Sequence, residues 1–263
     1  MYKKRVWLFV ALIYFFCVSP LTAEQVFRIV YFNKENPPRV VGSGTSINWS
    51  KPGITVELFK MVAQSVGMRF EFKRMPWKRC LYAVEHGMAD AAFHASFKPA
   101  RAEFGVYPTR NGQLDPSRGI YKNAYVFYAR KDSGVSWNGK ALGNAPRPIG
   151  TQLSYSIADD LRQMGYEVEE EATVSNNLNK LAAGRISAYA EIESIADYIL
   201  DKEKSRYENI VKLRPPLTEK VYYLLISKSF VQKNPKLAER IWDAVRDVQQ
   251  TAAYGEMVGK YLE

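Results

Sequence analysis

The side chains with the clearest chemical potential lie close together in the sequence, between Pro76 and Pro108. Ser96 and Arg101 follow a short apolar run, residues 89–93, that predicts a buried strand. In open α/β sheets ligands bind outside the carboxyl ends of strands, so polar side chains directly after such a strand face a crevice. An arginine there can bind a carboxylate through two parallel hydrogen bonds. We therefore expect a small-anion site centred on Arg101, the alternative being a salt bridge from Arg101 to Glu103.

Three neighbouring side chains could join Arg101 in such a site. Trp77 has a flat aromatic face that stacks on apolar, planar or cationic groups, although it could instead be a core residue. Ser96 can donate a hydrogen bond to the same anion or serve only the turn. His94 either lines the crevice or hydrogen-bonds the backbone beside it. Cys80 lies on the apolar face of a predicted helix, so we expect a buried and unreactive thiol.

The elements that would position these residues alternate between strands and helices. In the first half, apolar spacing predicts strands at residues 27–32 and 70–72 and helices at residues 54–66 and 77–86. A second series follows, with strands near Ile149, near Tyr166 and at residues 186–190, and helices from Ser156, at residues 178–183 and at residues 195–200. A last helix is predicted at residues 235–248. Such alternation predicts α/β sheets with parallel strand pairs covered by helices.

The stretch that contains Arg101 resembles a motif of a known family. In the periplasmic solute-binding proteins of family 3, which bind polar amino acids for ABC transporters, the pattern PWxxxxxxLxxGxxDA is followed by T-x-T-P-x-R. Here Ser96 and Lys98 stand at the two threonine positions, and Pro99 and Arg101 match the proline and arginine. The resemblance covers nearly all of the chain after residue 23, including residues 53–67, 140–156, 184–188 and 216–263.

The resemblance implies an α/β fold of the two-lobed periplasmic binding protein type II. Two extended crossovers, residues 125–130 and 221–226, would connect the lobes and form a hinge. We therefore expect a first lobe formed by residues 24–124 and 223–263 and a second lobe formed by residues 125–222. The last helix should pack on the first lobe, and residues 111–117 (NGQLDPS) look like an added surface loop.

The resemblance also implies roles for the candidate residues of the first lobe. Arg101 would clamp the α-carboxylate of the ligand, with the hydroxyl of Ser96 beside it. Trp77 would flank the side chain of the ligand. His94 stands where the family usually has a small residue.

In the second lobe, residues 151–156 (TQLSYS) precede a predicted helix, whose exposed backbone amides would suit an anionic group. The glycine-threonine pair of the family falls on Ser154 and Tyr155, which makes this loop bulkier. Ser154 or Ser156 could equally be an ordinary N-cap.

The family binds the amino group of its ligand with an aspartate that should follow the strand predicted to end at Ala190. Its place falls on Ile192, between Glu191 and Glu193. If either glutamate turns toward the ligand, amino-acid binding is retained. If neither does, a ligand without an α-amino group is favoured, because a desolvated ammonium would have no counter-charge.

Residues 1–23 have the pattern of a secretory signal peptide. A basic start, KKR, precedes an apolar run at residues 6–18 and a small-residue cleavage site at Ala23. We expect cleavage there and a mature protein in the periplasm. The alternative is an uncleaved membrane anchor, although the apolar run is shorter than the ~20 residues that a span needs.

Charge and composition narrow the classes of partner. The net charge of +10 falls to +7 when the three basic residues of the leader are removed. The basic residues are scattered, so they favour a small anionic ligand or an acidic partner only weakly and do not predict nucleic-acid binding. The chain has two histidines and no cysteine cluster, which argues against a zinc site, and no motif calls for a cofactor.

Three functions remain open from the sequence. The first is a non-catalytic, monomeric binding protein that closes its lobes on an amino acid or related carboxylate and is recognised by an ABC permease or a membrane sensor. The second is a dehydratase-like periplasmic enzyme, with His94, Glu191 and Glu193 as acid-base candidates. The third is a scaffold that binds another protein while its cleft stays empty.

Overall fold

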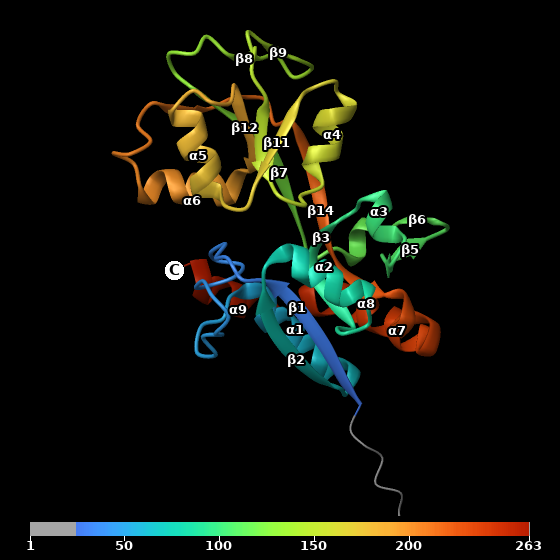
Figure 1. Ribbon diagram of the computed structural model, residues 1–263. Coiled ribbons are helices and arrows are strands. Elements are labelled where there is room, and N and C mark those ends of the chain that lie inside the picture. The colour runs from blue at the N-terminus through green and yellow to red at the C-terminus, as the bar shows by residue number, and fades with distance from the viewer. Residues whose placement is uncertain (1–24, 263) are drawn as a thin grey trace, which may run out of the picture.

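Two long antiparallel strands, β7 (Tyr121–Arg130) and β14 (Thr218–Ser227), run between two lobes (Figure 1). The computed structural model describes residues 25–262, so the predicted signal peptide lies outside the described residues. In the strand pair, Tyr125 lies opposite Thr218 and Tyr121 lies opposite Tyr222. Both predicted crossovers are present, and each strand extends a few residues beyond the apolar run that predicted it. The two-lobed α/β fold is confirmed.

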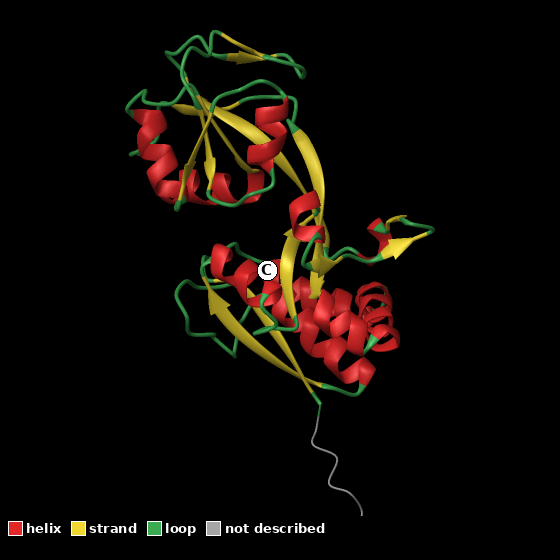
Figure 2. Ribbon diagram, turned by 45° about the vertical axis from the view of Figure 1, so that its right-hand side comes forward, coloured by secondary structure: helices red, strands yellow, loops and turns green. Residues whose placement is uncertain are grey.

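Lobe 1 is built on parallel strands with helices packed against them (Figure 2). Strand β1 lies between β2 and β3. The elements of this lobe up to residue 106 are β1 (Val26–Phe32), α1 (Ile54–Val66), β2 (Arg69–Met75), α2 (Trp77–Glu85), β3 (Ala91–Ser96), α3 (Pro99–Ala102) and β4 (Gly105–Val106). After the second crossover come α7 (Lys228–Lys233), α8 (Pro235–Gln249) and α9 (Ala252–Leu262).

Lobe 2 repeats this arrangement, with β10 between β11 and β12 in parallel. Its elements are β8 (Ser136–Trp137), β9 (Leu142–Gly143), β10 (Ile149–Gln152), α4 (Ile157–Gln163), β11 (Val168–Glu171), α5 (Val174–Ala182), β12 (Ala188–Ile192), α6 (Glu193–Lys202) and β13 (Ile210–Lys212). The crossovers join both lobes into one sheet of order β11-β10-β12-β7-β14-β3-β1-β2.

Helix α1 forms where the sequence predicted it because its apolar residues share one face. Leu58 and Val62 are fully buried in the core of lobe 1, and burying one such side chain is worth about 2 kcal/mol. Gly67 ends the helix in the left-handed conformation, with φ of 67°. Helix α8 packs against α1, as expected, and the Trp242 indole donates a hydrogen bond to the Leu224 carbonyl at 2.9 Å.

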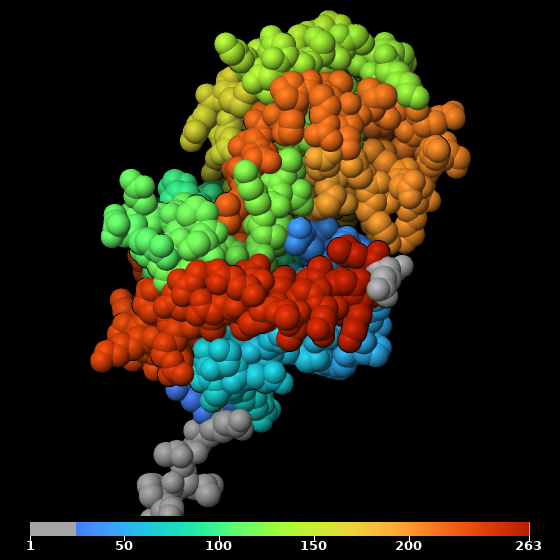
Figure 3. Space-filling model, turned by 180° about the vertical axis from the view of Figure 1, so that it is seen from behind, coloured from blue at the N-terminus to red at the C-terminus, as the bar shows by residue number. Residues whose placement is uncertain are grey.

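The C-terminal region contains two helices, α8 and α9, where the sequence predicted one. Seen from behind, this red segment lies across the back of lobe 1 (Figure 3). The hydroxyl of Tyr261 in α9 accepts a hydrogen bond from the backbone N–H of Gly53, just before α1. Within residues 25–262 no helix combines the length and apolar composition of a membrane span.

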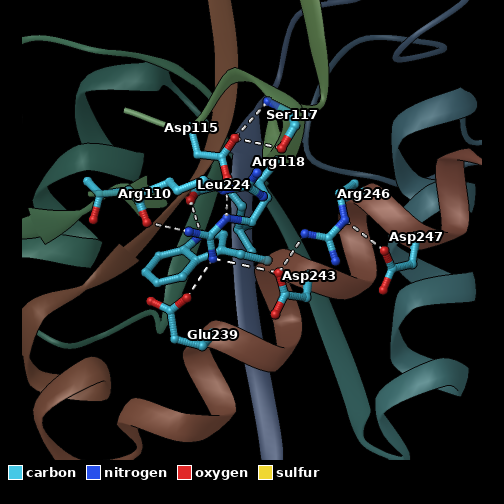
Figure 4. Close-up of polar contacts among 11 residues, drawn as sticks. Arg110, Asp115, Ser117, Arg118, Leu224, Glu239, Asp243, Arg246 and Asp247 are labelled. Carbon is cyan, nitrogen blue, oxygen red and sulfur yellow. Dashed lines mark hydrogen bonds and ion pairs between the residues drawn. The ribbon is translucent and has the colours of Figure 1, made fainter. Parts of the chain in front are cut away.

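Residues 111–117 are more than the surface loop that the sequence predicted. The segment closes a short hairpin of β5 (Thr109–Arg110) and β6 (Gln113–Leu114) and enters a helical turn, η1 (Pro116–Arg118). Asp115 and Arg118 form a buried ion pair at 3.1 Å, and Arg118 also pairs with Glu239 of α8 at 2.5 Å (Figure 4). The hairpin is therefore fixed to the C-terminal helices through its base.

Two strands end later than local apolar runs indicated. β3 reaches Ser96 because this residue pairs with Tyr222 of β14. β12 reaches Ile192, two residues beyond the predicted end at Ala190, because Ile192 pairs with Tyr125 of β7. Both extensions depend on pairing with a crossover distant in sequence, and both place site residues on rigid strand ends.

Candidate functional site

A cavity of about 220 Å³ lies between the lobes beside the two crossovers. The ends of β3 and β12, the start of α2 and the turn before α4 contribute to its wall. Six of the nine predicted site residues line it: Trp77, His94, Ser96, Arg101, Tyr155 and Ser156. Ser154, Glu191 and Glu193 do not line it.

Arg101 is a buried cation that joins the two lobes. One terminal nitrogen donates to the carbonyl of Ser96 and the other to the carbonyl of Ser154 in lobe 2, each at 2.8 Å. Its guanidinium carbon lies 5.4 Å from the ring centre of Trp77. Its Nε is buried without a hydrogen-bond partner in the described chain. The alternative pairing with Glu103 does not form, and no carboxylate of residues 25–262 lies within ion-pair distance of Arg101.

A pair of serine hydroxyls makes a second bridge between the lobes. Ser96 and Ser156 lie 2.8 Å apart at their Oγ atoms, and both side chains are buried. Lys220 of β14 donates to the Ser156 hydroxyl at 3.1 Å. Ser156 precedes α4, but its hydroxyl makes no capping hydrogen bond to the helix, so the alternative role of an N-cap side chain does not apply to it. Lys98 and Asp159 add an ion pair between the lobes at 2.8 Å.

The turn of lobe 2 uses backbone groups as well as side chains. Ser154 has a left-handed φ of 65°, a conformation uncommon for residues other than glycine. Its N–H donates to the Glu170 carboxylate at 2.9 Å, and its carbonyl accepts a hydrogen bond from the Arg101 guanidinium. Tyr155, the next residue, lines the cavity. The lobes are therefore in contact at the cavity edge, in a closed arrangement.

His94 lines the cavity and hydrogen-bonds a side chain. Its Nε2 lies 2.8 Å from the Thr55 hydroxyl, and its ring packs edge-on against Tyr121. Burial lowers the pKa of His94 well below its ordinary value, and the positive charge of Arg39 lowers it further. His94 is therefore neutral at physiological pH.

The two predicted acidic candidates do not line the cavity. Glu191 lies inside β12, fully buried, and its carboxylate accepts hydrogen bonds from the Tyr189 hydroxyl and the Ile192 N–H. Burial raises the pKa of Glu191 to about 7, although these hydrogen bonds oppose the rise. Glu193 pairs with Lys212, at 2.6 Å, and with Arg214. Ile192, between them, lines the cavity.

The sequence interpretation missed most of the aromatic wall. The crossovers supply Tyr121, Tyr125 and Tyr222, and α6 supplies Tyr198. Gln152, at the end of β10, also lines the cavity. The sequence predicted the crossovers only as a hinge. The tyrosines that recur in both strands could have indicated that the hinge also forms part of the cavity wall.

One further lining residue is acidic. Glu35, on the segment after β1, is the single carboxylate among the described lining residues, and it lies 3.6 Å from Lys202 of α6. Its side chain remains 26% exposed. Within residues 25–262 no three His, Cys, Asp or Glu side chains are placed to hold a metal ion.

Two α/β lobes joined by two strands, with a cavity at the hinge, define a solute-binding protein fold. The chain belongs to the bacterial extracellular solute-binding proteins, family 3, whose pattern matches residues 48–263. Its role is therefore to bind a ligand, and members of this family work outside the cytoplasm. No curated protein sequence matches the chain.

Solved structures of similar fold come from both sensing and transport proteins. A histidine kinase sensor domain with similarity to periplasmic binding proteins has a TM-score of 0.70 at 19% identity, covering 90% of this chain and 96% of its own. The substrate-binding protein of an amino acid ABC transporter has a TM-score of 0.65 at 17% identity, covering 90% and 99%. The arginine-, lysine-, histidine-binding protein ArtJ of Geobacillus stearothermophilus has a TM-score of 0.67 at 14% identity, covering 89% and 94%. At these identities the similarity concerns the fold.

Proposed function

We propose that this protein binds an amino acid or a related small carboxylate between its lobes, after export to the periplasm and removal of residues 1–23. The observation that carries the proposal is Arg101, a buried cation at the cavity with no carboxylate partner among the described residues. Two carbonyls accept from its terminal nitrogens, but they carry no compensating charge and leave its Nε without a partner. An anionic ligand would supply the missing charge.

The contacts between the lobes support closure as the response to binding. Arg101 contacts Ser154 across the cleft, and Ser96 contacts Ser156. A ligand held at these groups touches both lobes at once, which it cannot do when they are apart. It therefore stabilises the closed form through differential affinity.

The closed form would then be recognised by a membrane partner, an ABC permease or a sensor. The similar folds include both an ABC transporter binding protein and a histidine kinase sensor domain, so both roles have structural support. We propose that the binding protein acts as a monomer. The enzyme alternative has less support, because of its three candidate residues only His94 lines the cavity.

The proposal is tested by thermal shift on the mature protein after unfolding and refolding to remove bound ligand. The screen covers amino acids, their derivatives, and mono- and dicarboxylates. A ligand at 100 times its Kd should add about 2.7 kcal/mol to stability. Losing the charged hydrogen bonds of Arg101 should cost about 3 kcal/mol of binding, roughly a hundredfold in Kd, so Arg101→Ala at the same ligand concentration should gain less than about 0.5 kcal/mol.

The matched control is Arg69→Ala, which removes an exposed arginine whose ion pair with Glu71 lies within lobe 1. It should leave the shift unchanged. A hit that persists in Arg101→Ala, or a screen without any hit, would contradict the proposal. Product formation in the same incubations would support the enzyme instead.

A further inference from the structure

The cavity holds a cation but offers no free carboxylate beside it. Its charged lining residues are Arg101, Lys34 and Glu35 within the described chain. Glu35 is partly exposed to solvent and already faces Lys202. If the ligand were an α-amino acid with its carboxylate bound at Arg101, its ammonium group would lose its hydration and gain no counter-charge in the cavity.

Glu191 cannot serve as that counter-charge without rearrangement. It is fully buried within β12 and does not line the cavity, and its two oxygens already accept hydrogen bonds from Tyr189 and from the N–H of Ile192. The cavity surface at this place is the Ile192 side chain. Burial also raises the pKa of Glu191 toward neutrality, which weakens its negative charge further.

The aromatic and aliphatic part of the wall suits an apolar, planar body, whereas Asn36, Gln152 and Thr173 are among the uncharged polar residues of the lining. Seven phenylalanine, tryptophan and tyrosine side chains line the cavity: Phe32, Trp77, Tyr121, Tyr125, Tyr155, Tyr198 and Tyr222. Ile192 and Ile195 add an aliphatic surface from lobe 2. A volume of about 220 Å³ is below the roughly 300–1,000 Å³ of sites for drug-sized ligands, so the ligand has room for a small aromatic group and a short chain.

We propose that the cavity selects a small amine-free carboxylate with an apolar, planar body, such as an arylalkanoate, over the α-amino acid of the same skeleton. This proposal rests on the proposed function, in which Arg101 binds the carboxylate. The aromatic wall then packs on the body, and Ile192 and its neighbours exclude the ammonium.

Matched pairs of probes test this selection, because each pair differs only in the α-ammonium group. We would titrate the ligand-stripped mature protein by calorimetry with 3-phenylpropanoate against L-phenylalanine, indole-3-propanoate against L-tryptophan, and 3-(4-hydroxyphenyl)propanoate against L-tyrosine. We expect at least one amine-free probe to bind about tenfold or more tightly than its amino acid, and to lose binding in Arg101→Ala.

The outcomes separate the two proposals. An amino acid that binds as tightly as its amine-free partner, with loss of binding in Arg101→Ala, overturns the selection and leaves the proposed function standing. Binding that ignores Arg101 overturns both. If none of the six probes binds, the arylalkanoate proposal fails, while the wider carboxylate screen still decides the proposed function.

A gain-of-function variant adds a second measurement. Ile192→Asp places a carboxylate on the cavity wall, and Ile192→Asn has the same shape without the charge. The aspartate variant should shift the affinity ratio toward the amino acid by about tenfold relative to the asparagine variant. Equal ratios in two variants with native circular dichroism spectra would contradict the inference; if neither variant folds, the wild-type pairs still decide it.

Discussion

Glu191 gives a prediction whose sign is unusual for a carboxylate. Burial raises its pKa in the folded protein from 4.5 to about 7. The folded state therefore holds its proton more tightly than the unfolded state, and the free energy of unfolding falls as the pH rises between these two values. A shift from 4.5 to about 7 corresponds to about 3 kcal/mol at 1.36 kcal/mol per unit. Wild-type protein should carry none of this penalty below pH 4.5 and all of it above pH 7.

Glu191→Gln isolates this effect. The glutamine oxygen can accept from the Ile192 N–H, and its amide can donate to the Tyr189 oxygen, which retains the shape and the first hydrogen bond and reverses the direction of the second. Relative to wild type, the variant should gain about 3 kcal/mol between pH 4.5 and pH 8.

The assay is urea unfolding of wild type and variant at several pH values, with Glu193→Gln as the control. Glu193 forms partly exposed ion pairs, so its variant should follow the wild-type pH dependence. Parallel curves for wild type and Glu191→Gln would refute the conclusion that Glu191 is buried with a raised pKa, and would reopen its assignment as the amino-group partner.

Two further predictions concern the rest of the molecule. Asp115→Ala should destabilise the protein by about 3 kcal/mol in denaturant unfolding, because it leaves the buried Arg118 without its nearest buried carboxylate. The control, Arg110→Ala, removes an exposed partner of Asp115 and should change stability by less than about 0.5 kcal/mol. Equal effects of the two substitutions would contradict the conclusion that burial makes the Asp115–Arg118 ion pair important. Cys80 is fully buried, burial raises the pKa of its thiol, and its Sγ donates to the Met75 carbonyl. The folded protein should therefore resist alkylation by iodoacetamide until it is unfolded. If the folded protein were labelled as fast as an exposed thiol, the prediction that Cys80 is buried would be contradicted.

Much of the scaffold was predictable because its signals are local. The apolar face of α1 and the glycine that follows it predicted both ends of the helix from adjacent residues alone. The motif around Arg101 predicted an anion-binding arginine shortly after a strand, and the structure places Arg101 at the cavity. Cys80 was likewise expected to be buried, since its neighbours on the helix are apolar.

The remaining features depend on contacts between distant segments. The ends of β3 and β12 were misplaced because pairing with β14 and β7 extends them. Glu191 falls inside the extended β12, where its carboxylate accepts hydrogen bonds from Tyr189 and the Ile192 N–H and does not line the cavity. The contact of Arg101 with Ser154 joins two lobes, and no local pattern could indicate it.

The central claim is that the lobes close on a carboxylate held by Arg101. Its most direct test is small-angle X-ray scattering on ligand-stripped mature protein, with and without the carboxylate that gives the largest thermal shift. Wild type should become more compact when this ligand is added, and Arg101→Ala should stay at the ligand-free radius of gyration at the same ligand concentration. Equal compaction of wild type and Arg101→Ala, or binding to wild type without any compaction, would contradict the claim.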